Sequence, residues 1–184
     1  MKGVVFNLLE EAIRNQYGED TWDEMLEAAY LEGVYTSLGS YQDDELSKLV
    51  AVASEKLQAP RDSIVRWFGR SALPLLAERY PGFFDAHHST RPFLLTLNTI
   101  IHPEVRKIYP GADVPVFDYD KSADADDVLV MGYSSPRKLC AFGEGLIEGA
   151  AAHYGEAVGI IQPKCMNRGD QKCVLRISLR KATT

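Results

Sequence analysis

Three polar side chains with complementary hydrogen-bonding groups alternate in the stretch Met131–Cys140. Tyr133, Ser135 and Arg137 supply a phenol, a hydroxyl and a guanidinium at every second position. In an extended segment this spacing places all three side chains on one face. Two hydroxyl groups and a planar fork of N–H donors suit carboxylates that lie close together. The pattern therefore indicates either a site for a ligand that carries carboxylates or the polar face of an antiparallel strand with a surface arginine.

One histidine has surroundings that set it apart from the other three in the sequence. His102 follows an apolar run between residues 93 and 101 and is followed by Pro103. Proline lacks the backbone N–H and clashes with the carbonyl four residues earlier, so the helix is predicted to kink or restart beside His102. A lone histidine on an apolar face is usually a core residue with satisfied hydrogen bonds. A neutral imidazole in apolar surroundings is, however, also what axial ligation of haem iron requires.

A haem group would account for both patterns at once. Haem is flat and apolar, carries two propionates and needs at least one axial ligand. His102 would supply that ligand, and the three polar side chains of Met131–Cys140 would bind the propionates. The small residues of segment 137–155 and the apolar first helix would allow close approach of a porphyrin face.

Three cysteines form a second group of residues that could carry chemistry. Cys165 and Cys173 flank a predicted turn, and Cys140 lies one turn into a predicted helix. Three thiolates could begin a structural zinc site or act as a thiol-based redox switch, and they could equally be reduced, partly buried thiols. The fourth zinc ligand is not evident, because Gln162 is a poor ligand and His153 is only one alternative.

Composition and charge exclude several classes of protein. The 184 residues are 46% hydrophobic, enough to bury a core, and they carry a formal net charge of −6. Without a cluster of basic residues, the chain is not expected to bind nucleic acid or an anionic membrane surface. Its apolar stretches are too short to span a membrane, and its N-terminus does not resemble a signal peptide. An odd number of cysteines is unlike a secreted disulfide framework, so a cytoplasmic location is expected.

Apolar periodicity predicts a helical first half of the chain. The predicted helices cover residues 2–17, 21–30, 40–57 and 60–76, and a further helix begins at Thr90. Thr21 and Glu24 are expected to form a capping box at the start of the second helix. Pro74 and Pro81 are expected to interrupt the chain after the fourth.

The character of the sequence changes near Gly111. Strands are predicted over residues 113–119, 128–133, 157–161 and 173–178, with a helix over 137–155. The first two strands are expected to pair as a hairpin. The acidic run 118–127 lacks the residues that an EF-hand needs at its sixth and twelfth positions, and is predicted to be a loop. The expected fold is α+β. A single domain, 1–184, would pack a helical lobe, 1–60, on a lobe with an antiparallel sheet and helices, 61–184.

The spacing of these residues resembles a known family. Tyr133-x-Ser135-x-Arg137, some thirty residues after His102, is similar to the pattern of the H-NOX (haem-nitric oxide/oxygen binding) family, which is related to the haem domain of soluble guanylate cyclase. The resemblance extends over nearly the whole chain and includes Met1-Lys2-Gly3, the segments 18–22, 43–46 and 145–149, and Pro115. It implies a haem b between the two lobes, with His102 as proximal ligand and the Tyr-x-Ser-x-Arg side chains on the propionates. Pro115 would press on the porphyrin and distort it.

The resemblance also bears on the choice of gas. Members that bind O₂ stably are similar to one another in having a distal tyrosine on the helix after the motif. Phe142 occupies the matching position, five residues after Arg137, and has no donor for bound O₂. The other residues predicted for the distal wall are apolar: Val5, Leu9, Leu73 and Leu146. The expected ligands are therefore NO and CO, with no stable O₂ complex, and the expected function is NO sensing.

Membership of this family implies a sensor without enzymatic activity. NO would bind ferrous haem opposite His102, the iron–histidine bond would weaken or break, and strain held by Pro115 would relax as the lobes shift. Because the sequence ends soon after its last predicted strand, the signal is expected to pass to a separate protein. The expected partner is a sensor histidine kinase or a cyclic-di-GMP enzyme.

Two other functions fit parts of the sequence. A haem-free module of similar shape would bind another small carboxylate or a lipid with the same polar residues. A haem peroxidase is less well supported, because it needs a polar acid–base pair on the distal side, where the predicted residues are apolar.

Overall fold

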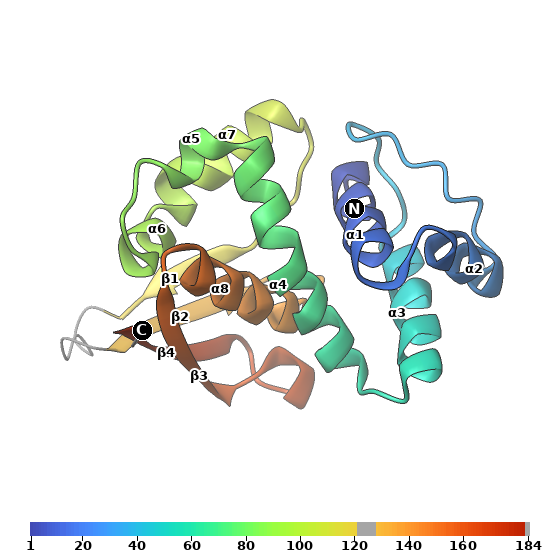
Figure 1. The fold of residues 1–184 in the computed structure, drawn as a ribbon. Coiled ribbons are helices and arrows are strands. Elements are labelled where there is room, and N and C mark those ends of the chain that lie inside the picture. The colour runs from blue at the N-terminus through green and yellow to red at the C-terminus, as the bar shows by residue number, and fades with distance from the viewer. Residues whose placement is uncertain (121–127, 183–184) are drawn as a thin grey trace.

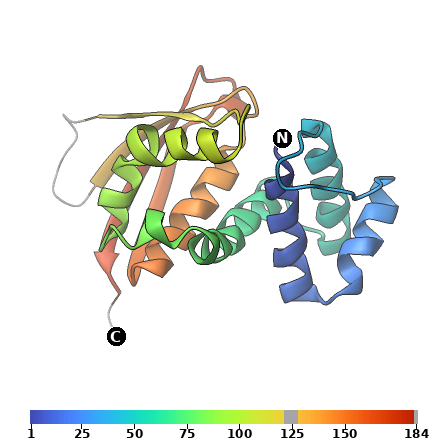
Figure 2. The same cartoon turned by 90° about the horizontal axis from the view of Figure 1, so that it is seen from above.

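The computed structural model describes residues 1–120 and 128–182. A group of three N-terminal helices lies beside a helix-covered sheet, and one long helix, α4 (Arg61–Arg79), joins the two (Figures 1 and 2). This is the α+β architecture expected from the sequence. The greater part of the predicted acidic loop, residues 121–127, lies outside the described residues.

The N-terminal helices follow the predicted ranges closely. They are α1 (Gly3–Tyr17), α2 (Asp20–Ala29) and α3 (Asp43–Leu57). Gly18 ends α1 with a φ of 101°, a backbone conformation that favours glycine. The predicted capping box is wrong: α2 begins one residue before Thr21, whose hydroxyl donates to the Tyr17 carbonyl at 2.9 Å instead. The acidic side chains in the first turn of α3 interact favourably with the positive end of the helix dipole, which favours a start at Asp43.

Helix α4 continues through Pro74, which the sequence predicted would interrupt it. Proline in a helix interior removes one hydrogen bond, here the one to the Arg70 carbonyl, at a cost of about 3 kcal/mol. Packing offsets this cost, because buried side chains precede Pro74 and the partly buried Leu75 and Leu76 after it pack against the apolar clusters. Phe68 and Ala72 belong to the N-terminal core, and Leu73 belongs to the core under the sheet.

Helix α8 (Cys140–His153) crosses α4 at very close range. A Cβ on Gly69 would collide with the Phe142 carbonyl, and one on Gly145 would collide with the Arg66 carbonyl. The small residues of segment 137–155 were expected to admit a porphyrin face. Gly145 and Gly149 instead admit the backbone and side chains of α4, and Gly143 alone of the glycines in α8 lines the large cavity described below.

Four strands form one antiparallel sheet in the order β1-β2-β4-β3. They are β1 (Val116–Tyr119), β2 (Val128–Ser134), β3 (Glu156–Lys164) and β4 (Cys173–Lys181). The predicted pairing of the first two strands is confirmed, with Phe117 opposite Tyr133. Met131 of β2 lies opposite Leu175 of β4. These side chains belong to the same buried cluster as Ile147 and Ala150 of α8, the helix that covers one face of the sheet (Figure 1).

Short helical segments cover the rest of that face. They are α5 (Pro81–Phe84), α6 (Thr90–Leu95), the π-helical turn Leu97–Ile101 and α7 (His102–Ile108). A 3₁₀ turn, Met166–Arg168, connects β3 to β4. Buried apolar side chains form one cluster among α1–α4 and a second between the sheet and these helices. The lobe boundary between residues 60 and 61 stays a prediction. No helix among the described residues has the length and apolarity to cross a membrane.

Candidate functional site

A large cavity lies where the two parts of the fold meet. Its volume is about 460 Å³, and its lining comes from α1, α3–α8 and three strands of the sheet. That volume lies in the range of roughly 300–1,000 Å³ that suits small-molecule and cofactor sites. Most of the lining is apolar, and its polar side chains include those of the Tyr-x-Ser-x-Arg motif and His102.

The chain places His102 at a break in helical geometry, as predicted. The π-helical turn Leu97–Ile101 ends immediately before it, and α7 begins at His102 with Pro103 in its first turn. π-helical turns are rare and are often found at functional sites. The imidazole stacks on Phe117 of β1, with 5.5 Å between ring centroids. His102 therefore lines the cavity with its ring orientation fixed.

The surroundings of His102 favour a neutral imidazole. Burial and the nearby charge of Arg106 lower the pKa of His102 to about 4, and a hydrogen bond to the Pro115 carbonyl offsets part of that shift. Histidines that bind metals usually engage their second ring nitrogen in this way, because it fixes the tautomer and the ring orientation. At neutral pH the other nitrogen keeps its lone pair, which is the form that binds iron.

The three motif side chains reach the cavity, although the motif is not extended throughout. β2 ends at Ser134, so Tyr133 comes from the strand while Ser135 and Arg137 come from the turn after it. Tyr133 and Ser135 are buried, and all three line the cavity. Burial raises the pKa of Tyr133, and its hydrogen bonds with Ser135 and the Leu139 backbone partly offset this. The tyrosine is therefore a neutral O–H donor.

Two aspartates that the sequence reasoning missed hold Arg137. Its Nε donates to Asp43 at the start of α3, at 2.8 Å. Its Nη1 donates to the side chain of Asp113 at 3.0 Å and to the Asp113 carbonyl at 2.6 Å. The Arg137 guanidinium and the N-terminal ammonium of Met1 help to lower the pKa of Asp43 against the opposing effect of burial. The sequence did not reveal these partners because they are distant along the chain; Asp43 is 94 residues from Arg137.

The predicted apolar wall is present with one exception. Val5, Leu73, Phe142 and Leu146 line the cavity, and so does Pro115. Leu9 does not: it lines a smaller cleft among α1–α4, because each step of four residues turns the α1 side chains about 40° further around the axis. Phe142 packs against Phe68, which sequence reasoning missed, with 4.8 Å between ring centroids. Tyr80 and Tyr109, also missed, join their hydroxyls at the cavity wall.

The residues present fit a haem group. The apolar walls suit a porphyrin, the hydroxyls and guanidinium of the motif suit its carboxylates, and a neutral, oriented imidazole suits its iron. The motif donors and the imidazole reach the same cavity from different elements. This suits a ligand such as haem, whose iron and propionates need separate binding groups.

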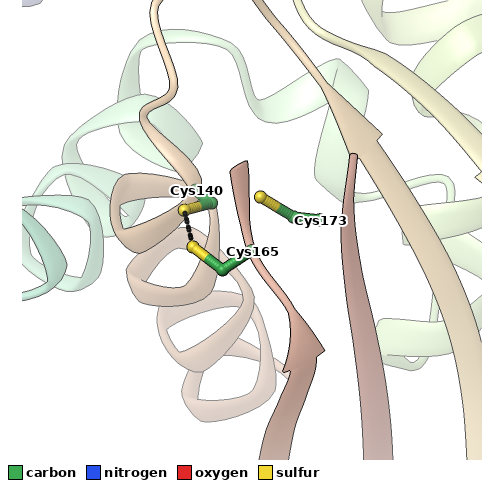
Figure 3. Close-up of side chains that lie close together, drawn as sticks. All are labelled: Cys140, Cys165 and Cys173. Carbon is green, nitrogen blue, oxygen red and sulfur yellow. Dashed lines mark hydrogen bonds between the residues drawn. The ribbon is translucent and has the colours of Figure 1, made fainter. Parts of the chain in front are cut away.

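The three cysteines form a separate cluster in which their side chains lie close together (Figure 3). Cys140 at the start of α8, Cys165 after β3 and Cys173 at the start of β4 are all buried, with their sulfur atoms within 4.8 Å of one another. The Sγ atoms of Cys140 and Cys165 are 3.7 Å apart. Burial raises the pKa of Cys140 to about 12, although a hydrogen bond with the Gln162 side chain lowers it in part. None of the three sulfur atoms belongs to the lining of the large cavity.

Comparison with known proteins decides the family. The model of the haem-NO-binding family (HNOB) matches residues 2–162. The chain belongs to this family. Its members are the H-NOX domains, which are haem-binding gas sensors and not enzymes.

Solved H-NOX structures share the whole fold. An H-NOX protein from S. oneidensis in the Fe(II)NO ligation state is 32% identical, with a TM-score of 0.91 over 98% of this chain and 100% of that one. The Shewanella oneidensis SO2144 H-NOX domain in the Fe(II)CO state is 32% identical, with a TM-score of 0.87 over 98% of this chain and 99% of that one. The unliganded Fe(II) H-NOX protein from K. algicida is 27% identical, with a TM-score of 0.87 over 100% and 99%.

Proposed function

We propose that this H-NOX chain senses nitric oxide through a b-type haem. His102 would be the proximal ligand, and Tyr133, Ser135 and Arg137 would hold the propionates. When bound, the haem supplies the ferrous iron that captures the gas. The chain supplies a neutral imidazole in a fixed orientation, three donors for carboxylates and an apolar enclosure that excludes water. Relatives in NO and CO ligation states support this proposal.

The observation that carries the preference for NO is the side chain at position 142. Phe142 lies in the cavity wall and offers no hydrogen-bond donor, and Val5, Leu73 and Leu146 offer none either. Bound O₂ carries partial negative charge and gains most from a donor, whereas NO and CO depend on one less. The cavity therefore favours NO and CO over O₂.

Absorption spectroscopy of the reduced protein tests this preference directly. The haem-loaded ferrous protein should take up NO and CO and keep its unliganded spectrum in air, apart from slow oxidation. A stable oxy complex in air would overturn the NO-sensor proposal. Protein that shows no Soret band after expression with adequate haem would favour the alternative, a haem-free module for another carboxylate or a lipid.

We propose further that the haem state is relayed from this cytoplasmic domain to a sensor histidine kinase or a cyclic-di-GMP enzyme. The lobes proposed at 1–60 and 61–184 would change their relative position, with Pro115 against the porphyrin. A ligand shifts such an equilibrium only by its differential affinity for the two arrangements. The activity of a purified histidine kinase or cyclic-di-GMP enzyme from the same organism, measured with the ferrous and the NO-bound protein, tests the relay. Equal activity with both forms would contradict it.

The spacing of the cysteines favours a second candidate function, which is zinc binding. Four thiolates placed tetrahedrally at the usual Zn–S distance of about 2.3 Å would lie about 3.8 Å apart. The Cys140–Cys165 separation of 3.7 Å agrees with that value. We propose that the three thiols bind zinc with a fourth ligand from solvent or a nearby side chain.

Elemental analysis of protein expressed with adequate zinc tests this second proposal. One zinc per chain is expected, with loss of the metal in Cys165→Ser. Zinc-free protein that forms a disulfide under mild oxidants would indicate the redox switch instead. Protein with neither property would leave the cysteines as buried thiols.

A further inference from the structure

One face of the four-stranded sheet points away from the buried cluster under α8. Side chains alternate along a strand, so the residues between the buried ones lie on this second side. In the middle of the sheet they are Val130 of β2 and Arg176 of β4, which lie opposite each other, and Ile161 of β3, which lies opposite Arg176. Ile161 is 68% exposed. We refer to this side of the sheet as the outer face.

The outer face combines branched apolar side chains with small residues. The apolar residues are Val128, Val130, Val174 and Ile161. Neither apolar cluster among the described residues includes any of these four. Beside them lie the small residues Ala157, Gly159 and Ser178. A Cβ added to Gly159 would meet nothing within 4 Å, so the backbone there is open to close approach. Covering an apolar surface of this kind lowers the free energy.

The strands that form half of this face are basic, although the whole chain has a formal net charge of −6. In segment 156–181 the acidic residues are Glu156 and Asp170. Both carboxylates accept hydrogen bonds from backbone N–H groups at 2.8 Å. The basic residues of the segment are Lys164, Arg168, Lys172, Arg176, Arg180 and Lys181. The local charge is therefore opposite in sign to that of the chain.

Two arginines of the outer face have no carboxylate beside them. Arg176 and Arg180 are both exposed and lie four residues apart on β4, so their side chains leave the same face about 13 Å apart. In the part of the chain that the structure describes, neither guanidinium takes part in an ion pair or a hydrogen bond. Lys172, just before β4, differs, since its Nζ lies 3.0 Å from Asp118. The two guanidiniums are thus available for carboxylates from outside.

We propose that the outer face docks an acidic amphipathic helix of a partner protein. The apolar side of that helix covers Val130 and Ile161, and its carboxylates pair with Arg176 and Arg180. Carboxylates seven residues apart lie on one side of a helix and about 11 Å from each other, which suits the two guanidiniums. Complementary charge then selects an acidic partner. The inference rests on the proposed function only for the partner's identity, the enzyme of the proposed relay, because the surface itself needs no haem.

A synthetic peptide tests the surface without that enzyme. The probe is an amphipathic helix of about 18 residues, or five turns, with leucines on one side and glutamates seven residues apart at its margin. A control peptide carries lysines in place of the glutamates. In the CO-bound protein, saturable amide shifts with the glutamate peptide should gather on β3 and β4. Absence of such shifts, or equal shifts with the lysine peptide, would overturn the inference.

Charge reversal shows whether the arginines carry the interaction. Calorimetry should give a dissociation constant for the glutamate peptide that rises at least about tenfold in Arg176→Glu. Arg61→Glu makes the same change at an exposed position at the start of α4 and should leave the constant as in the wild type. Both variants should keep the wild-type haem content and CO spectrum, which reports that they fold. Equal loss of affinity in both variants would indicate a general effect of net charge and would contradict the assigned site.

The purified histidine kinase and cyclic-di-GMP enzyme that test the relay serve as further probes. The one that binds should lose at least about tenfold in affinity with Arg176→Glu and with Ile161→Asp. An enzyme that binds both variants as it binds the wild type would overturn the inference and leave NO sensing intact. If neither enzyme binds the wild type, the relay fails and the peptide titration decides on the outer face.

Two other occupants have their own signatures. A second copy of this chain would give self-association in sedimentation velocity that Arg176→Glu abolishes. An anionic membrane would give binding to phosphatidylglycerol vesicles that the same variant abolishes. Either result would assign the outer face to that occupant and overturn the proposal of a partner helix.

Discussion

The large cavity and the cysteine cluster lie at the two ends of one short turn, and burial acts on them in opposite ways. Arg137 lines the cavity, and Cys140, three residues later, begins the cluster. Burial lowers the pKa of His102 and raises the pKa of Cys140, so both side chains are neutral at neutral pH. A neutral imidazole is the form that binds a metal, whereas a thiol must first lose its proton. The first site therefore needs no loss of a proton before it binds a metal, whereas a metal at the second site would have to displace thiol protons.

Removal of His102 should give the largest effect. His102→Gly deletes the axial ligand and the ring that stacks on Phe117, so most of the haem should be lost on purification. Added imidazole should restore part of the Soret absorbance per protein. His88→Gly removes an exposed histidine and should retain haem as the wild type does. Normal five-coordinate ferrous haem in His102→Gly without imidazole would exclude His102 as the ligand.

Loss of the Arg137 charge should weaken haem binding less severely. Hydrogen bonds to charged groups contribute about 1.5–3 kcal/mol, so Arg137→Gln should raise the haem dissociation constant on the order of tenfold or more. Lys138→Gln removes the same charge from the next residue, which is exposed, and should change haem affinity little. Transfer of haem to a competing apoprotein measures both. Equal transfer from the two variants would show that Arg137 does not hold the propionates.

A donor added to the apolar wall should change the choice of gas by a smaller amount. Phe142→Tyr places a hydroxyl in the large cavity, where one hydrogen bond to bound O₂ is worth about 1 kcal/mol. The ferrous variant should therefore show a longer-lived oxy complex in air than the wild type. Phe142→Leu enlarges the same region without adding a donor and should not. Equal oxy lifetimes in both variants would remove position 142 from the account of gas selectivity.

The smallest expected effect is a loss of folding stability at acid pH. The pKa of His102 is about 4 in the folded chain and about 6.5 in the unfolded chain. The unfolded chain therefore binds more protons between these values, and haem-free protein should lose stability as pH falls from about 6.5 to about 4. The slope should stay below the 1.4 kcal/mol per pH unit of one full proton, since the ring is only partly buried. Urea unfolding at several pH values should show a smaller slope in His102→Gln.

Local patterns in the sequence were sufficient for most of the elements and for His102 and the three motif residues of the large cavity. The apolar periodicity of α1 and α3, the break before His102 and the pairing of β1 with β2 all depend on neighbours in sequence. The family resemblance then related Pro115 and Phe142 to the same cofactor. Both line the large cavity.

The features that were missed depend on packing between distant segments. Pro74 remains helical because α4 packs against both apolar clusters, and Gly145 and Gly149 of α8 face α4 because the two helices cross there. Leu9 differs from Val5 by a small rotation about α1 that periodicity does not resolve. The partners of Arg137 come from other elements, and no spacing rule connects them.

Arg137 contacts the N-terminal helices and the segment before β1, and it also lines the large cavity. A guanidinium has five N–H donors in one plane. Three belong to Nε and Nη1, which hold Asp43 in the N-terminal helices and Asp113 in the segment before β1. Any carboxylate that approaches from the cavity meets a cation whose place is already set by both. If a binding partner weakens the Asp43–Arg137 contact and so changes the affinity for that carboxylate, the carboxylate must change the affinity for the partner by the same factor.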